Sequence, residues 1–317
     1  MAIRRRARGG GREVEFFAGL SQSRSLVLYL AAGLAIACYM VAVRYGTSFL
    51  VALVANLGLL AIYLAVVNLV TRGAAPRPLP VNRPGLELAL LLAYTAFLCL
   101  RATEQVPWLD LSGQIPAYRQ IDGLLVGAVQ AALRPLWPGG ALPAAVFQAT
   151  GNLFWLLLVP LAIFLALGYR PVTLGLAPSR WWVALPLMAI GALPSLAEGD
   201  LWQAGHPVEL ASDFVGTLLA TGLAEEVFFR GLLLSRLEAW TGRGLDALAL
   251  GALVYGLAQA PAYLAVDGLD FTLVTARVVT TSFAPTALAW GYVYLRTRSV
   301  APAALWHASP WPIFPFG

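Results

Sequence analysis

Long apolar runs separated by short polar segments dominate the first third of this chain. These runs extend over Leu26–Val43, Phe49–Val70 and about Leu86–Leu100, the last with Glu87 near its end. Helical runs of about 17 to 25 predominantly apolar residues are long enough to cross a bilayer. The pattern therefore predicts three membrane-spanning helices in this part of the chain.

The next segment, residues 101–140, breaks this pattern. Proline and glycine interrupt it too often for a single span. We predict instead a short amphipathic helix at about Tyr118–Leu133 that lies at the membrane interface.

Apolar runs then return and continue almost to the C-terminus. The last of them is short, and the others are long enough for spans. The predicted elements lie at about Pro143–Leu167, Trp181–Leu196, Asp213–Trp240, Leu245–Val266, Phe271–Leu295 and Val300–Trp311. With the earlier runs they predict an all-α fold, a polytopic transmembrane helical bundle of eight or nine helices.

The composition agrees with a membrane location. Of the 317 residues, 59% are hydrophobic and 12% are charged, whereas soluble domains average about 45–50% apolar and about 25% charged residues. The net charge of +5 comes from arginines in short loops beside the spans, with no basic stripe for nucleic acid. Anchoring to anionic lipid explains these arginines better. We therefore expect an integral membrane protein with no nucleic-acid partner.

The distribution of arginine predicts how the helices are threaded, because cytoplasmic loops carry the excess of basic residues. With a cytoplasmic N-terminus, the outer loops hold only Arg44, Arg101, Arg119 and Arg134. The N-terminus and the inner loops hold Arg4, Arg5, Arg6, Arg8, Arg12, Arg24, Arg72, Arg77, Arg83, Arg170, Arg180, Arg236, Arg243, Arg296 and Arg298. The sequence therefore predicts an N-terminus in the cytoplasm.

Candidate chemistry is concentrated in one apolar run, Asp213–Trp240, which contains Glu225, Glu226 and Arg230. A charge near the middle of a bilayer costs about 2.5–3.5 kcal/mol on insertion scales, so such a cluster indicates a functional site. Glu226 and Arg230 are one helical turn apart and can neutralise each other, while Glu225 points about 100° away. Glu225 is therefore a spare buried carboxylate of the kind that serves acid/base chemistry.

The order of three polar segments resembles a known family. Glu225-Glu226-x-x-x-Arg230 is followed by Tyr255-x-x-x-Gln259 and, after RTRSVAPAALW, by His307. This arrangement, over about residues 165–312, is similar to the CAAX prenyl protease and bacteriocin-processing (Abi) family of glutamic-type intramembrane endopeptidases. The resemblance implies an eight-helix core in which Glu225 activates water and His307 stabilises the oxyanion. Glu226 and Arg230 match the supporting pair of the family's pattern.

Three positions depart from that family's pattern. Gln259 stands in place of the His of the second motif, Tyr255 in place of its Phe, and Trp311 in place of a later Asn. Glutamine cannot act as a base and can only orient a water through its amide. The sequence therefore leaves open a pseudoprotease that serves as a membrane binding or chaperone module. A transporter is a third alternative, although the paired half-repeats typical of transporters are not visible.

Each candidate residue also has a purely structural interpretation. Glu226 with Arg230 can be a salt bridge that locks the helix in its bundle, which is compatible with catalysis by Glu225. His307 alone would be interpreted as a capping or interfacial residue, and His206 as a loop residue. Two histidines that are not shown to converge make a poor ligand set, so we expect no metal and no cofactor.

These observations give an expected organisation in three parts. Residues 1–24 form a flexible Arg-rich N-terminus, residues 25–169 hold the first spans and the interfacial helix, and residues 170–317 form the protease-like core. The resemblance implies a peptide or protein substrate at the lipid bilayer and is compatible with a partner membrane protein. It also implies an integral location in the membrane, which we place in the bacterial inner membrane.

Overall fold

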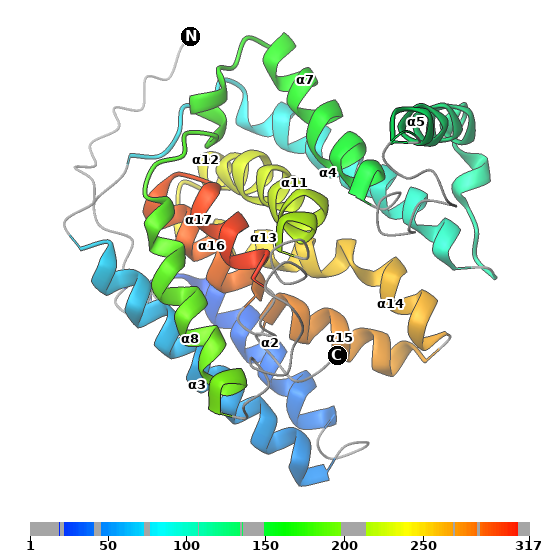
Figure 1. The fold of residues 1–317 in the computed structure, drawn as a ribbon. Helices are drawn as coiled ribbons and strands as arrows, with labels where there is room; N and C mark the ends of the chain where they lie inside the picture. The colour runs from blue at the N-terminus through cyan, green and yellow to red at the C-terminus, as the bar shows by residue number, and fades with distance from the viewer. Residues whose placement is uncertain are drawn as a thin grey trace, which may run out of the picture.

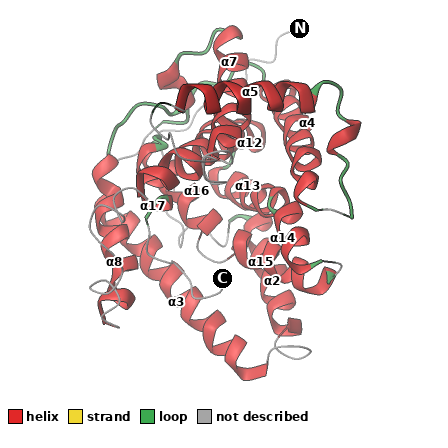
Figure 2. Cartoon of the chain, turned by 45° about the vertical axis from the view of Figure 1, so that its right-hand side comes forward, coloured by secondary structure: helices red, strands yellow, loops and turns green. Residues whose placement is uncertain are grey.

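The protein is helical throughout the part of the chain that the computed structural model describes: residue 19 and residues 22–40, 46–72, 77–106, 108–133, 135, 149–197, 214–268, 270–283 and 286–309. These residues are 82% helical and contain no strand, as Figure 2 shows. With adjoining helical segments joined, isolated 3-10 turns left out and Gly244–Asp267 counted as one helix, they form eleven helices. The all-α prediction is confirmed, and the predicted count of eight or nine is slightly low.

The first half of the bundle follows the apolar runs of the sequence. Its helices are α2 (Arg24–Met40), α3 (Gly46–Val70), α4 (Pro84–Ala102) and α5 (Tyr118–Leu133), with 3-10 turns η2 (Thr103–Gln105) and η3 (Ser112–Gln114) between the last two. The bounds of α5 are those of the predicted amphipathic helix. Figure 1 shows α5 at the periphery of the molecule, beyond one end of α4.

The second half consists of shorter elements. The helix that contains Glu225 and Glu226 is called the Glu-Glu helix here. Before it come η4 (Leu153–Leu158, π-helical), α7 (Val159–Ala166), η5 (Pro171–Leu174), η6 (Trp181–Val183) and α8 (Ala184–Ala197). After it come α13 (Gly244–Ala258), α14 (Ala260–Asp267), α15 (Phe271–Phe283), α16 (Thr286–Thr297) and α17 (Ala301–His307). Figure 1 shows α16 and α17 packed beside the Glu-Glu helix near the middle of the molecule.

One predicted span contains a turn, and another is described in two parts. The run at Leu245–Val266 has its turn at Gln259, where Pro261 in the first turn of α14 has no N–H for the carbonyl one turn back. The run at Phe271–Leu295 is described as α15 and α16. Residues 284 and 285 between them lie outside the described residues, so the single eighth span stays a prediction.

Three helices in the described part of the chain are long and apolar enough to cross a membrane: Pro84–Gln105, Ala149–Ala166 and Gly244–Asp267. Shorter apolar helices extend over Arg24–Ile36, Leu57–Val70 and Trp181–Ala192. Continuous apolar helices of this length satisfy their own backbone hydrogen bonds, which lipid cannot do. The protein is an integral membrane protein.

The Glu-Glu segment is the central helix of the fold. Residues 214–241, here called the site helix, comprise a first turn, η7 (Leu218–Gly222), α11 (Leu223–Glu225), η8 (Glu226–Leu234) and α12 (Ser235–Thr241) without a break. All of its residues from 224 to 238 are buried. A helix that is buried on all sides belongs to the core of the bundle, so its polar side chains must find partners inside the protein.

Three arginines that the threading assigned to loops are instead buried. Arg236 lies within α12, Arg296 in the last turn of α16, and Arg298 follows α16, and all three are buried. Buried charges are stable only when they are paired and hydrogen-bonded. Arg236 and Arg298 are therefore paired inside the protein. Arg298 lies in the turn after α16 as assigned, whereas counting Arg236 as a loop arginine was wrong.

Candidate active site

The two adjacent glutamates lie where the site helix changes its winding. Glu225 ends the short α-helical segment α11, and Glu226 begins the nine-residue π-helical segment η8. π-Helical turns are rare and occur frequently at functional sites. The expected contact within this helix is present, because Arg230 Nη1 lies 3.1 Å from Glu226 Oε1.

Glu225 has a polar partner from another helix. The Tyr255 hydroxyl of α13 donates a hydrogen bond to Glu225 Oε2 at 2.7 Å. The Glu225 residue keeps 8% of its surface exposed, whereas Glu226 has none. The partner of Glu225 is therefore a neutral phenol, which fits the expectation of a carboxylate without its own cation.

His307 approaches the other glutamate. Its Nδ1 lies 3.1 Å from Glu226 Oε1, and its ring is stacked on that of Trp290 with centroids 3.8 Å apart and an interplanar angle of 18°. The ring plane of His307 is thus fixed from two sides. Sequence reasoning placed His307 at the site but missed Trp290, which belongs to none of the motifs.

Glycines on the site helix allow this close approach. A Cβ at Gly222 would lie 2.8 Å from the Ala304 carbonyl oxygen of α17, and one at Gly231 would lie 2.7 Å from the Leu174 carbonyl oxygen. Small residues at such contacts let membrane helices pack backbone to backbone. Gly222 therefore determines how near α17, and with it His307, comes to the glutamates.

Aromatic rings enclose the cluster. The Arg230 guanidinium carbon lies 4.5 Å from the centroid of the Tyr255 ring and 5.4 Å from that of Trp290. Phe229 packs edge-on against Tyr255 with centroids 4.9 Å apart. Cation–π contacts of this kind gain strength when they are desolvated, so the rings help to hold the buried charge of Arg230.

Several buried polar atoms at this site have no hydrogen-bond partner within the described residues. They are Glu226 Oε2, both terminal nitrogens of Arg230, and the indole nitrogens of Trp290 and Trp306. Arg230 thus meets Glu226 at ion-pair distance without a well-aligned hydrogen bond. Such groups are usually satisfied by water or a ligand. The site is therefore chemically suited to receive water and the polar groups of a peptide.

Gln259 lies at the junction of α13 and α14, one turn after Tyr255. It is half-buried, and its backbone N–H reaches the carbonyls of Tyr255 and Gly256 at 3.3 and 3.2 Å. The site helix does contact α13 and α17 as expected. A polar cavity shared by Glu225, Gln259 and His307 stays a prediction.

The other sequence candidates give no metal site. Within the described ranges, no group of three or more His, Cys, Asp or Glu residues is placed to hold a metal ion. His206 and Trp311 lie outside the described residues.

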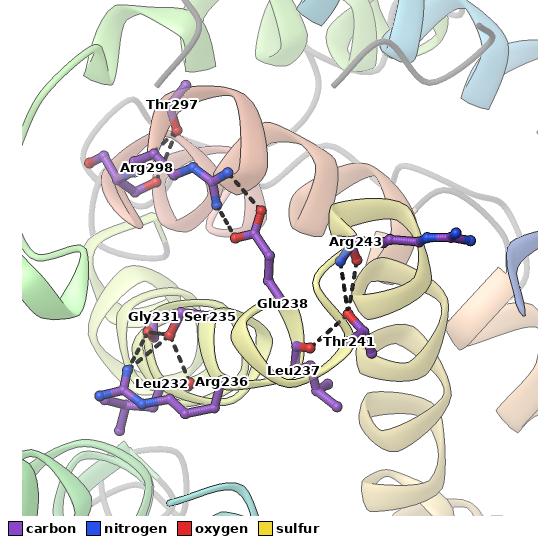
Figure 3. Close-up of polar contacts among 11 residues, drawn as sticks. Gly231, Leu232, Ser235, Arg236, Leu237, Glu238, Thr241, Arg243, Thr297 and Arg298 are labelled. Atoms are coloured by element: carbon purple, nitrogen blue, oxygen red, sulfur yellow. Dashed lines mark hydrogen bonds and ion pairs between the residues drawn. The ribbon is translucent and has the colours of Figure 1, made fainter. Parts of the chain in front are cut away.

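A second polar cluster lies further along the site helix. Arg298 Nη1 and Nη2 donate to Glu238 Oε2 and Oε1 at 2.5 and 2.9 Å, and Figure 3 shows this fork-to-fork pairing. Arg236 Nε donates to Glu87 Oε2 of α4 at 3.1 Å, and Tyr169 donates to both oxygens of Glu87 at 2.7 and 2.8 Å. We call these five residues the anchor cluster. They join the site helix to α4, to the segment after α7 and to the end of α16.

Comparison with known proteins agrees with the motifs. Residues 207–309 match the family model of the type II CAAX prenyl endopeptidase Rce1-like proteins. No curated protein and no solved structure matches the chain. The matched segment contains Glu225, Glu226, Arg230, Gln259 and His307, so the predicted resemblance is confirmed there. The wider core at residues 170–317 stays a prediction.

Proposed function

We propose that this protein is a glutamic-type intramembrane endopeptidase that cleaves a peptide or protein near the membrane. The observation that carries the proposal is the burial of Glu225 and Glu226, with His307 in contact with Glu226, inside a segment that matches the Rce1-like family. Its substrates fall in the range that the family suggests, from prenylated C-termini to bacteriocin leaders and C-terminal sorting tags. The reaction is hydrolysis of a peptide bond.

In this mechanism Glu225 is the general base. It takes a proton from water, the resulting hydroxide attacks the scissile carbonyl carbon, and the tetrahedral intermediate expels the amine, which receives the proton from Glu225. Since Tyr255 occupies Oε2, Oε1 is the oxygen that faces the water. Gln259 orients that water through its side-chain amide.

His307 stabilises the oxyanion. Its Nδ1 lies against Glu226 Oε1, so Nε2 is the ring nitrogen that is left to donate to the oxyanion. Glu226 therefore contacts both Arg230 and His307. Removal of one oxyanion donor typically costs about 10²–10³ in rate.

The proposed location is the bacterial inner membrane with the N-terminus in the cytoplasm. The five arginines before the first span and the later loop charges support this orientation. A cysteine introduced at Gly10 should resist an impermeant thiol reagent in intact cells and react after permeabilisation. Labelling in intact cells would show that the N-terminus lies outside the cytoplasm.

The catalytic proposal is tested by hydrolysis of internally quenched peptides by the reconstituted full-length protein. The panel contains a prenylated C-terminal peptide, its unprenylated counterpart and a bacteriocin leader. Glu225→Gln keeps the shape of the side chain but removes the base, and we expect it to abolish cleavage. Glu104→Gln, at a carboxylate that accepts from Tyr118 at 2.7 Å, is the matched control. Undiminished cleavage by Glu225→Gln would rule the mechanism out.

Gln259 favours one alternative, a pseudoprotease that binds peptides without cleaving them. An amide cannot replace the basic imidazole of the second motif. In that case the native protein is inert towards every peptide, and Gln259→His creates cleavage. Glu225-dependent cleavage by the native protein excludes this alternative.

A further inference from the structure

Tyr255 is the hydrogen-bond partner of Glu225 from another helix, and the mechanism above uses it only to assign Oε1 to the water. Tyr255 Oη donates to Glu225 Oε2 at 2.7 Å, across 30 residues of sequence and between two helices. Both side chains are buried. A hydrogen bond to an ionised group is stronger than one between neutral groups, and burial strengthens it further.

The position of the Tyr255 ring is fixed on several sides. Phe229 meets it edge-on at 4.9 Å and Trp290 edge-on at 6.4 Å between centroids, and the Arg230 guanidinium lies over its face at 4.5 Å. A phenol held in this way loses little conformational freedom when it makes its hydrogen bond. Its hydroxyl is therefore a preorganised donor rather than a group that finds Glu225 by rotation.

This contact determines what the carboxylate can do. Since the bond engages Oε2, the lone pairs of Oε1 stay available to a water. Without this contact the carboxylate could rotate about its terminal torsion, which has no sharply preferred angle in glutamate.

Building on the proposed function, we propose that Tyr255 is a positioning residue that holds the Glu225 carboxylate in the orientation from which Oε1 activates the attacking water. It thereby compensates in part for the missing histidine at Gln259. The hydroxyl of Tyr255 is the group that holds Glu225, and a Phe at this position would lack it. Tyr255 does not touch the substrate, so it acts on turnover and not on substrate binding.

The decisive variant is Tyr255→Phe in the full-length reconstituted protein, assayed with whichever quenched peptide of the panel is cleaved. A lost hydrogen bond to a charged group corresponds to about a 10- to 100-fold decrease in kcat, and KM is expected to stay unchanged. Tyr169→Phe is the matched control, because it removes another buried phenol that donates to a carboxylate, Glu87. It should leave kcat unchanged per folded molecule.

A further measurement separates positioning from a structural role. Labelling of Glu225 by dicyclohexylcarbodiimide should be faster in Tyr255→Phe than in the native protein or in Tyr169→Phe, because the phenol no longer holds Oε2. The labelling is read by mass spectrometry and does not depend on activity.

The outcomes distinguish this inference from the proposed function. Cleavage that persists in Glu225→Gln removes the proposed function. Glu225-dependent cleavage with native kcat in Tyr255→Phe overturns the role of Tyr255 alone, as does unchanged labelling of Glu225. If the native protein is inert, the labelling comparison decides whether Tyr255 controls the state of Glu225.

Discussion

Two polar clusters on the site helix differ in how completely their carboxylates are paired. In the anchor cluster, every carboxylate oxygen of Glu87 and Glu238 accepts at least one hydrogen bond. In the cluster around Glu225 and Glu226, Glu226 Oε2 has no hydrogen-bond partner in the described part of the chain. Both clusters include buried residues of the site helix, so burial alone does not explain why their carboxylates differ in pairing.

The difference separates structure from chemistry. Arg236 Nη2 and Arg298 Nε of the anchor cluster also lack a hydrogen-bond partner within the described residues, so the two clusters differ in their carboxylates and not in their arginines. Paired carboxylates fix one arrangement of helices, whereas an unpaired buried carboxylate oxygen carries a cost that a structural role alone does not justify. The Arg236 guanidinium carbon is also stacked 4.5 Å from the Phe164 ring and 4.7 Å from the Tyr169 ring. The anchor cluster thus holds the helix that carries the candidate active site.

The largest effect is expected from breaking the anchor cluster. Arg298→Met leaves the Glu238 carboxylate buried without its cation, and such a loss lowers the free energy of unfolding by about 3–5 kcal/mol. Thermal unfolding in detergent measures it. Replacing both partners, Glu238→Leu with Arg298→Met, should recover much of the loss, because an apolar pair carries no desolvation penalty. Equal destabilisation of the single and double variants would contradict a buried ion pair.

The second effect separates the two glutamates. Glu226→Gln leaves Arg230 without its counter-ion and weakens the contact with His307, and it should lower the free energy of unfolding by about 3 kcal/mol. Glu225→Gln keeps an acceptor for Tyr255 and should leave stability nearly unchanged while abolishing hydrolysis. Membrane accumulation, thermal stability and cleavage are measured for both variants. The same loss of stability in both would show that the glutamate pair is purely structural.

The sequence predicted what depends on local pattern and missed what depends on packing between helices. The α5 helix has the predicted bounds because proline and glycine delimit it, and the Glu226–Arg230 contact followed from spacing within one helix. The Tyr255–Glu225 and Arg236–Glu87 contacts link residues 30 and 149 positions apart. Such pairs depend on how each helix is rotated in the bundle, which an apolar run does not encode.

The charge pattern shows the same limit. Arg236 and Arg298 are arginines near helix ends, where loop counting assigns them to the membrane surface. Their burial is determined by acids on other parts of the chain, Glu87 for Arg236 and Glu238 for Arg298. Glu87 lies near the end of an apolar run, and an acid in such a run indicates that a cation is buried next to it.

A smaller effect is expected from replacing Gly222, the glycine of the site helix that packs against α17. Gly222→Ala places a methyl group 2.8 Å from the Ala304 carbonyl oxygen, and overpacking of this kind costs about 1–3 kcal/mol. Because α17 must move away, His307 withdraws from Glu226 and cleavage should decrease with stability. Gly216→Ala is the matched control on the same helix, since nothing lies within 4 Å of its added Cβ. Similar behaviour of the two variants would mean that the close contact does not position His307.

The smallest effect is expected where one phenol hydroxyl is removed from the anchor cluster. Burial raises the pKa of Tyr169, so its phenol stays protonated and donates to Glu87 at neutral pH. Tyr169→Phe removes that donor and the acceptor of the Asn82 N–H, but Glu87 keeps Arg236 Nε and the Arg83 N–H. The free energy of unfolding should therefore fall by only about 1 kcal/mol, as measured by thermal unfolding. Turnover per folded molecule should not change, because the anchor cluster only holds the site helix in place. A loss of turnover as large as that of Tyr255→Phe would erase the distinction between the two clusters, since an equivalent phenol–carboxylate bond far from His307 would then serve catalysis equally well.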